Sequence, residues 1–257
     1  MADRETLRMT FDQDAEGYAR NRPSYPAELF DDLAEFVVGR RALEIGCGTG
    51  QATIPLARKG FEVTAIELGA NLAASARKAV AGVGTVEVIQ AAFEQWPLPQ
   101  EGFDLVVAAT SWHWLDPATR VSKVADALRP GGVLAVISTE HVGGGTRPFF
   151  EDVQRCYERF DPATPPGLKQ IESDDIPYDA TEFERLGPVT FRRYHMDITY
   201  RTSDYLAVLA TYSGHIALPA DARAGLFDCV ANLIDTKYGG AITKRYMIQS
   251  LLTNATR

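Results

Sequence analysis

The segment from Arg41 to Gly60, RALEIGCGTGQATIPLARKG, joins a short apolar run to a helical pattern through a glycine-rich loop. The loop glycines stand at alternate positions, where they permit positive φ and let a ligand approach the backbone closely. The free N–H groups of the helix that follows favour an electron-rich ligand group. In an open parallel sheet such a loop lies at the carboxyl end of a strand, where ligands bind. The segment therefore predicts a ligand-binding α/β fold.

Apolar runs and helical patterns alternate through the first half of the chain. Strands are expected at 41–46, 62–67, 86–90, 103–109 and 132–138, and helices at 51–59, 71–80 and 117–128. The sequence LRPGG at 128–132 is expected to end the last of these helices, because Pro and Gly stop a helix. Strands that alternate with helices imply right-handed crossovers and a parallel sheet.

The second half is less regular. A strand is expected at 188–200, helices at 203–211 and 221–235, and a further strand after Gly239. A helical insert between the last two strands can cover the mouth of the sheet as a lid. We expect one domain over 1–257, with a cofactor-binding core at 36–140, an N-terminal flap at 1–35 and a lid at 141–187 and 201–238.

Charge and composition exclude several classes of protein. The formal net charge is -8 and basic residues do not cluster, which disfavours a nucleic-acid partner. No apolar run approaches the roughly 18 residues of a membrane span, and the charged start does not resemble a signal peptide. We expect a monomer or a homodimer without a membrane partner.

The cysteines and histidines show no ligand spacing. Cys47, Cys156 and Cys229 are odd in number and widely separated, which predicts no disulfide framework and favours a reducing, cytoplasmic setting. The four histidines, at 113, 141, 195 and 215, lack a spacing such as i, i+4, so no metal is expected.

The glycine spacing bears on the kind of cofactor. The dinucleotide fingerprint requires Gly-x-Gly-x-x-Gly, but its third glycine position is Gln51 here, and the third glycine is Gly50 instead. Glu67 stands 67 − 46 = 21 residues beyond Gly46, where an acid accepts hydrogen bonds from ribose hydroxyls. Every nucleoside cofactor carries a ribose, so Glu67 does not distinguish NAD from the others. The glycine spacing is the feature that distinguishes them.

Further motifs carry a family resemblance. LEIGCGTG, TAIELGANLAASAR, FDLVVAATSWHWLDP and LRPGGVLAVI follow one another in the chain. Together they resemble the class I S-adenosylmethionine-dependent methyltransferases, of the type 11-like kind. The sequence RPSYP at 22–26 and the His113-Trp114 pair are similar to the trans-aconitate methyltransferase group. The resemblance implies a Rossmann-like doubly wound seven-stranded sheet, mostly parallel with an antiparallel last strand, plus helical lid insertions.

The resemblance also implies S-adenosylmethionine as cofactor and S-adenosylhomocysteine as product. The residues implied to bind the cofactor are Tyr18, Arg22, Glu44, Gly46, Cys47, Gly48, Gly50, Glu67, Leu68, Ala92, Phe93 and Thr110. Glu44 orients the amino group of the methionine part, Glu67 takes the ribose hydroxyls and Leu68 packs on the adenine. Ala92 departs from the Asp that is common in the family, so either Glu94 or backbone and water hold the adenine amino group.

The acceptor side has weaker signals. His113 is the candidate general base or substrate orienter, because it follows the fourth strand; its alternative role is to pack and frame the pocket. The other candidate acceptor residues are Trp112, Trp114, Glu140, His141, Tyr212 and His215. Cys47 is expected to be a small side chain in a tight turn and not a nucleophile.

The expected function is methyl transfer to an oxygen or nitrogen of a small-molecule acceptor. A nicotinamide-dependent oxidoreductase is the first alternative, although the glycine spacing disfavours it. A methyltransferase-like protein that binds the cofactor without turnover is the second, and Ala92 is its only support. A macromolecular acceptor is a third, and the acidic charge makes RNA the weakest form of it.

Overall fold

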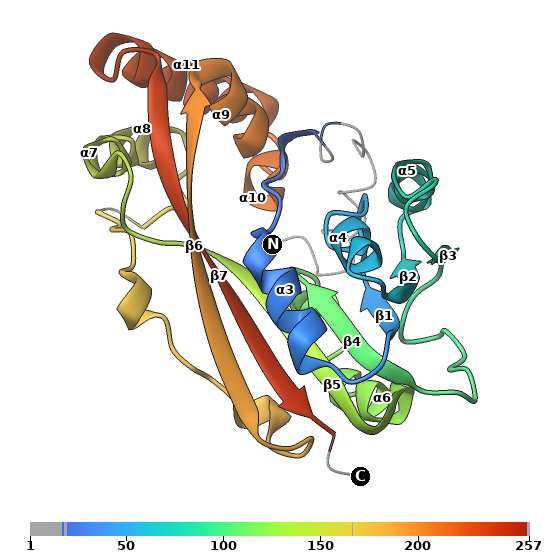
Figure 1. Ribbon diagram of the computed structural model, residues 1–257. Coiled ribbons are helices and arrows are strands. Elements are labelled where there is room, and N and C mark those ends of the chain that lie inside the picture. The colour runs from blue at the N-terminus through green and yellow to red at the C-terminus, as the bar shows by residue number, and fades with distance from the viewer. Residues whose placement is uncertain (1–16, 18–19, 166, 256–257) are drawn as a thin grey trace.

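Seven strands form one sheet in the order β3-β2-β1-β4-β5-β7-β6 (Figure 1). They are β1 (Arg41–Ile45), β2 (Glu62–Glu67), β3 (Val86–Gln90), β4 (Phe103–Ala109), β5 (Leu128–His141), β6 (Val189–Arg201) and β7 (Ala241–Asn254). The first five strands are parallel, and β7 lies antiparallel between β5 and β6. The expected Rossmann-like sheet with a reversed last strand is confirmed.

The computed structural model describes residues 17, 20–165 and 167–255. The central strands are buried on both faces, which explains their nearly continuous apolar sequences. On neighbouring strands, Ala42 and Leu105 pack on one face, and Leu43 and Val106 pack on the other. Each of these side chains is 0% exposed.

Helices cover both faces of the sheet. They are α3 (Ala27–Phe36), α4 (Thr53–Arg58), α5 (Ala70–Ala79) and α6 (Arg120–Ala127). Leu29 and Phe30 of α3 and Leu56 of α4 join the core on one face. Val124 and Ala127 of α6 join the core on the other. No helix among the described residues has the length and apolar composition that crossing a bilayer requires.

The strand order determines where a ligand can bind. Because β2 and β4 flank β1 on opposite sides, the connections after β1 and β4 diverge to opposite faces of the sheet and leave a crevice at the carboxyl ends of the strands. The loops that follow β1, β2 and β4 meet there.

A second layer of helices gathers beyond one end of the β6–β7 hairpin (Figure 1). It contains α7 (Arg147–Asp152), α8 (Gln154–Phe160), α9 (Thr202–Leu209), α10 (Ser213–Ile216) and α11 (Ala220–Lys237). These helices share their own apolar core, which includes Phe149, Val208 and Val230. The expected helical insert between the last two strands is present as α9 to α11.

The expectation that the cysteines stay unpaired is wrong for two of them. Cys156 of α8 and Cys229 of α11, which are 73 positions apart in the sequence, form a disulfide, and Cys47 is free and buried. The packing of α11 on α8 brings the two sulfurs together, and the linear spacing gave no sign of this approach. The argument for a reducing compartment rested on unpaired cysteines, so it no longer holds.

Two boundaries also differ from expectation. Helix α6 ends at Ala127 with Leu128 as its C-cap, as the LRPGG sequence predicts, but the segment itself already belongs to β5, where Leu128 pairs with Phe103 before the register shifts at Leu105. Residues 27–36, expected within or next to a flap, form helix α3 with a buried face. The part of the flap expected over residues 27–35 is therefore a packed helix.

The disulfide leads to a stability prediction. A crosslink over this loop length stabilises by about 2–4 kcal/mol, so reduction should lower Tm by roughly 5–15 °C. Alkylation in denaturant should modify one thiol without reductant and three with it. The Cys156→Ala/Cys229→Ala double variant is the control, since reductant should leave its Tm unchanged. Modification of three thiols without reductant would contradict the pairing.

Candidate functional site

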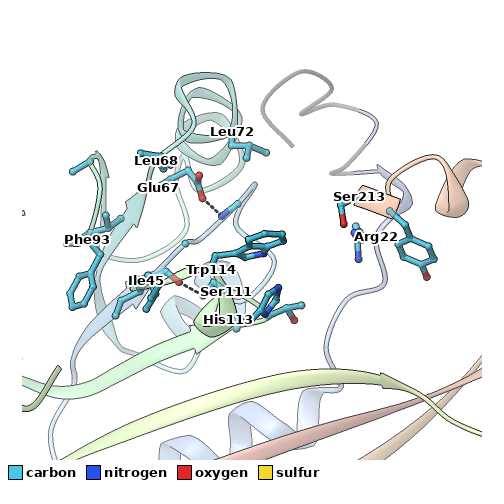
Figure 2. Close-up of a pocket in the computed structure, with 18 of the residues that line it drawn as sticks. Arg22, Ile45, Glu67, Leu68, Leu72, Phe93, Ser111, His113, Trp114 and Ser213 are labelled. Atoms are coloured by element: carbon cyan, nitrogen blue, oxygen red, sulfur yellow. Dashed lines mark hydrogen bonds between the residues drawn. The ribbon is translucent and has the colours of Figure 1, made fainter. Parts of the chain in front are cut away.

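A cavity of about 350 Å³ lies at the carboxyl ends of the parallel strands. Figure 2 shows Glu67 and Leu68 on one side of it, Arg22 and Ser213 on the opposite side, and His113 and Trp114 between them. The predicted residues that line it are Arg22, Gly46, Gly48, Glu67, Leu68, Phe93, Thr110, His113, Trp114, His141 and Tyr212. The fold thus brings residues from the glycine loop, the strand ends and the helical layer to one space.

The remaining predicted residues lie elsewhere. Glu44 and Cys47 line a smaller cavity of about 60 Å³, which also borders Gly46, Gly48 and Arg22. Tyr18 lies outside the described residues. The residues that line neither cavity are Gly50, Ala92, Trp112, Glu140 and His215.

The glycine loop is fixed to the end of β2 by hydrogen bonds. The N–H groups of Gly46 and Cys47 donate to the carbonyl of Ile66 at 2.8 and 3.1 Å. The N–H of Gly48 donates to Glu67 Oε2 at 2.8 Å (Figure 2), and the N–H of Gly69 donates to Glu67 Oε1 at 2.9 Å. The Glu67 carboxylate thus links the glycine loop to the turn that follows β2.

The loop backbone requires glycine. Gly46 and Gly48 have φ values of 72° and 56°, which side chains rarely adopt. A Cβ at Gly46 would also lie 2.7 Å from Cβ of Ser111, whose hydroxyl donates to the Ile45 carbonyl. The loop therefore presents bare backbone to the cavity.

Glu44 is buried beneath this loop with an exposed fraction of 1%. Its Oε2 accepts a hydrogen bond from Thr53 Oγ1 at 2.6 Å. Burial, together with the nearby Glu67, raises the pKa of Glu44 to about 8, although the Thr53 bond opposes this shift. A cationic ligand group nearby would favour the ionised form.

Thr110 has a strained backbone at the end of β4. It is the one described non-glycine residue with positive φ, at 56°. Its Oγ1 lies 2.9 Å from the Tyr25 hydroxyl and 3.5 Å from Thr139 Oγ1. The RPSYP segment is therefore tied to the strand end that borders the cavity.

The sequence expectation for Trp112 is corrected. Its indole packs on Phe183, with ring centroids 5.4 Å apart, and its Nε1 donates to Glu182 Oε2 at 3.1 Å. Arg120 pairs with the same carboxylate and lies over the indole. Trp112 is a core residue, because the short helix at Trp112–Trp114 turns it away from the cavity.

His113 and Trp114 do face the cavity. Their rings lie 4.7 Å apart, and the His113 side chain is exposed. Burial of part of the ring and the nearby Arg120 lower the pKa of His113, while Glu140 opposes the shift. The imidazole is therefore neutral at pH 7 and able to accept a proton.

His215 and Glu94 are also corrected as site residues. His215 Nδ1 hydrogen-bonds to the Leu209 carbonyl at 2.8 Å, and its ring lies against Tyr212, outside the cavity lining. Glu94 Oε1 accepts from the N–H of Asp116 at 3.3 Å and does not reach the lining.

Lys244 is a residue that the sequence analysis missed. Its side chain is 4% exposed, and its Nζ lies 3.4 Å from Nδ1 of His141. Burial, and then the charge of Arg22, lower the pKa of Lys244 to about 7. The sequence did contain a sign that Lys244 is buried, because strand alternation places it on the same face of β7 as the apolar Ile242 and Ile248.

Arg22 connects the N-terminal segment with the helical layer. Its Nη2 donates to the Thr211 carbonyl at 2.9 Å, and its guanidinium lies 4.7 Å from the Tyr212 ring centroid. Arg22 lines both cavities, and its positive charge is close enough to Lys244 to lower the pKa of that lysine.

No group of three or more His, Cys, Asp or Glu side chains suited to a metal ion occurs within the described part of the chain.

Comparison with known proteins agrees with this geometry. Residues 43–136 match a family described as a methyltransferase domain. An uncharacterized methyltransferase of Mycobacterium tuberculosis is 38% identical over 138 residues, which are 52% of this chain and 54% of that protein. A trans-aconitate 2-methyltransferase of Rhizobium leguminosarum is 28% identical over 191 residues, covering 72% of each chain.

Two solved structures share the fold. One from Anaeromyxobacter dehalogenans, provisionally assigned as a type II methyltransferase, has a TM-score of 0.64 at 24% identity, over 91% of this chain and 97% of that one. A SAM-dependent methyltransferase of Geobacter sulfurreducens, in complex with S-adenosyl-L-homocysteine, has a TM-score of 0.53 at 17% identity, over 95% and 98%.

The resemblance to the class I methyltransferases is confirmed by the methyltransferase-domain match over residues 43–136 and by relatives named methyltransferases. The chain spans about half the length of the mycobacterial relative.

The buried ammonium leads to a pH prediction. The pKa of Lys244 is about 7 in the folded state and 10.5 ordinarily, so between these values the unfolded chain binds more protons and the free energy of unfolding rises with pH. Lys244→Met should be more stable than the wild type by about 1–4 kcal/mol at pH 7. Its advantage should shrink towards pH 10, as measured by urea unfolding. A constant difference across this range would show that Lys244 does not titrate in this way.

Proposed function

We propose that this protein is an S-adenosylmethionine-dependent methyltransferase that acts on an oxygen or nitrogen of a small-molecule acceptor. The observation that carries the proposal is the Glu67 carboxylate, held by two backbone N–H groups beside the bare glycine loop, within a methyltransferase domain.

The residues present fit this cofactor. Glu67 offers acceptor positions to ribose hydroxyls, and Leu68 and Phe93 provide apolar walls for a base. Glu44 lies below the loop to favour an amino group, and Arg22 is the candidate partner for a carboxylate. When bound, the cofactor supplies an electrophilic methyl group on a sulfonium. The protein has mainly to align the acceptor and exclude water.

Two observations bear on the acceptor: the name of one relative and the position of His113. The related protein from Rhizobium leguminosarum is named for trans-aconitate, a small molecule, which favours a small acceptor here. His113 is exposed to the cavity and neutral at pH 7, so it is placed to take a proton from a hydroxyl or amine.

The oxidoreductase alternative needs a nicotinamide dinucleotide in the same cavity. The spacing Gly46-x-Gly48-x-Gly50 lacks the third glycine of that fingerprint, and Gln51 stands in its place. The structure thus gives no observation that favours this alternative.

Ligand-dependent thermal unfolding tests the cofactor. A ligand at 100 times its Kd adds about 2.7 kcal/mol to the free energy of unfolding, which should raise Tm by roughly 5–10 °C. We expect this rise with S-adenosylhomocysteine and none with NAD. A rise with NAD alone would support the oxidoreductase, and no rise with either would remove the support for an enzyme of this class.

Glu67 should determine affinity for the nucleoside. Glu67→Gln replaces a charged acceptor with a neutral amide, so the Kd for S-adenosylhomocysteine should rise about tenfold or more. Isothermal titration calorimetry measures this. The matched control is Glu62→Gln, an exposed glutamate at the start of the same strand. Equal affinity in the two variants would refute the ribose role.

A base role for His113 predicts a loss of rate. His113→Gln should lower kcat by about 100-fold or more with an acceptor that must lose a proton, because general base catalysis typically contributes that much. Binding of S-adenosylhomocysteine should stay within twofold. An unchanged kcat would assign His113 to framing the pocket.

A further inference from the structure

The short helix Trp112–Trp114, which carries His113, is held from behind by an ion pair between Arg120 and Glu182. Arg120 is the first residue of α6, and its Nε and Nη2 donate to the two carboxylate oxygens of Glu182 at 2.5 and 2.7 Å. Glu182 lies in the short helix Thr181–Phe183, ahead of β6. A pair with two parallel hydrogen bonds adds geometric specificity to the attraction of the charges.

The Arg120–Glu182 pair holds Trp112 at two points. Arg120 Nη1 donates to the Trp112 carbonyl at 3.0 Å, and the Trp112 indole N–H donates to Glu182 Oε2 at 3.1 Å. The guanidinium also lies 5.0 Å from the indole centroid. Because the Trp112 carbonyl belongs to the planar peptide group that joins Trp112 to His113, the ion pair fixes the plane from which the His113 side chain leaves the backbone.

Partial burial makes the Arg120–Glu182 pair more effective than a surface pair. The side chains of Arg120 and Glu182 are 15% and 31% exposed, and Trp112 belongs to the apolar core. An exposed pair is screened by water and contributes little. None of these three side chains lines the main cavity, which is lined by His113 and Trp114. The pair therefore acts on the cavity indirectly, through the backbone of the short helix.

The pair also sets the charge that His113 faces. Burial of the ring lowers the pKa of His113 most, the Arg120 guanidinium lowers it further, and Glu140 at the end of β5 opposes both effects. Because the Glu182 carboxylate is paired with Arg120, it offsets part of the guanidinium charge that reaches the imidazole. Removal of the Glu182 charge should therefore strengthen the effect of Arg120 on His113.

We propose that Glu182 is a positioning residue for His113, acting through Arg120 and the peptide group of Trp112. It holds the short helix so that the imidazole faces the cavity, and it limits the positive charge that the imidazole meets. Glu182 itself touches neither cofactor nor acceptor in this role. This inference rests on the proposed function, in which His113 is the candidate general base.

The first test follows the His113 ring by NMR in the ligand-free protein, with His113→Gln to assign its signals. The rings of His113 and Trp114 lie 4.7 Å apart, so the indole displaces the imidazole proton shifts, and the difference from Trp114→Leu measures this displacement. We expect Glu182→Ala to lose at least about half of it, because the two-point hold on the short helix is released. Arg120→Lys keeps the charge without the parallel hydrogen bonds and should lose a comparable part.

The pKa of His113, from the same NMR signals followed against pH, is a second readout. Glu182→Gln removes the negative charge and keeps an acceptor for the Trp112 indole, so the pKa of His113 should fall further, by about 0.3 or more. Arg120→Gln removes the positive charge, so the pKa of His113 should rise towards its ordinary value of 6.5. If the pair only stabilised the fold, both variants would move the pKa in the same direction, since both lose the same ion pair.

The matched control is Asp197→Asn, which breaks another arginine pair with two parallel hydrogen bonds, to Arg245 of β7. Its His113 signals should equal those of the wild type. Should Glu182→Ala fail to fold, Arg120→Lys provides the ring-shift result. Wild-type ring shifts in the variant used, or pKa changes of one sign in Glu182→Gln and Arg120→Gln, would overturn the inference.

Cofactor binding separates this inference from the proposed function. Glu182→Gln should bind S-adenosylhomocysteine within about twofold of the wild type by isothermal titration calorimetry, because Glu182 lies outside the cavity lining. Failure of the wild type to bind would refute the proposed function, whereas the NMR comparison is made without ligand and would still stand. Normal binding with an unchanged His113 ring would refute the inference alone.

Discussion

The hydrogen bonds that join the glycine loop to the end of β2 determine the geometry of the site. The Ile66 carbonyl accepts from two loop N–H groups, and the Glu67 carboxylate accepts from Gly48 and Gly69. Without these bonds the loop after β1 would be free to move relative to the strand that carries Glu67. With them, bare backbone and a carboxylate face one cavity and are held there by contacts within the protein itself. This is preorganisation, which spares the cost of ordering the site on binding.

The site also contains buried ionisable groups, whose burial disfavours their charged forms. Glu44 is buried under the loop with a raised pKa, and Lys244 is buried among rings with a lowered one. Glu44 accepts a hydrogen bond from Thr53 beneath the glycine loop, whereas Lys244 lies beside His141. No described contact joins the two residues. A cationic ligand group near Glu44 would favour the ionised form of this carboxyl group. Strongly perturbed groups that border a cavity are characteristic of functional sites.

The sequence was informative where function depends on local backbone. Gly46, Gly48 and Glu67 were predictable, because a strand, a glycine turn and a second strand end require only short-range patterns. Which way a side chain faces depends on later packing, so Trp112 was misplaced. The Cys156–Cys229 pair depends on the approach of α8 and α11, which short-range patterns do not encode. Lys244 could have been found, since alternation alone puts it on a buried face.

The central claim is that Glu67 and the glycine loop hold the nucleoside of S-adenosylmethionine. A crystal structure of the complex with S-adenosylhomocysteine tests it most directly. The account predicts both ribose hydroxyls within hydrogen-bond distance of the Glu67 carboxylate, with the base between Leu68 and Phe93. A nucleoside bound elsewhere, or a ribose that does not contact Glu67, would contradict it.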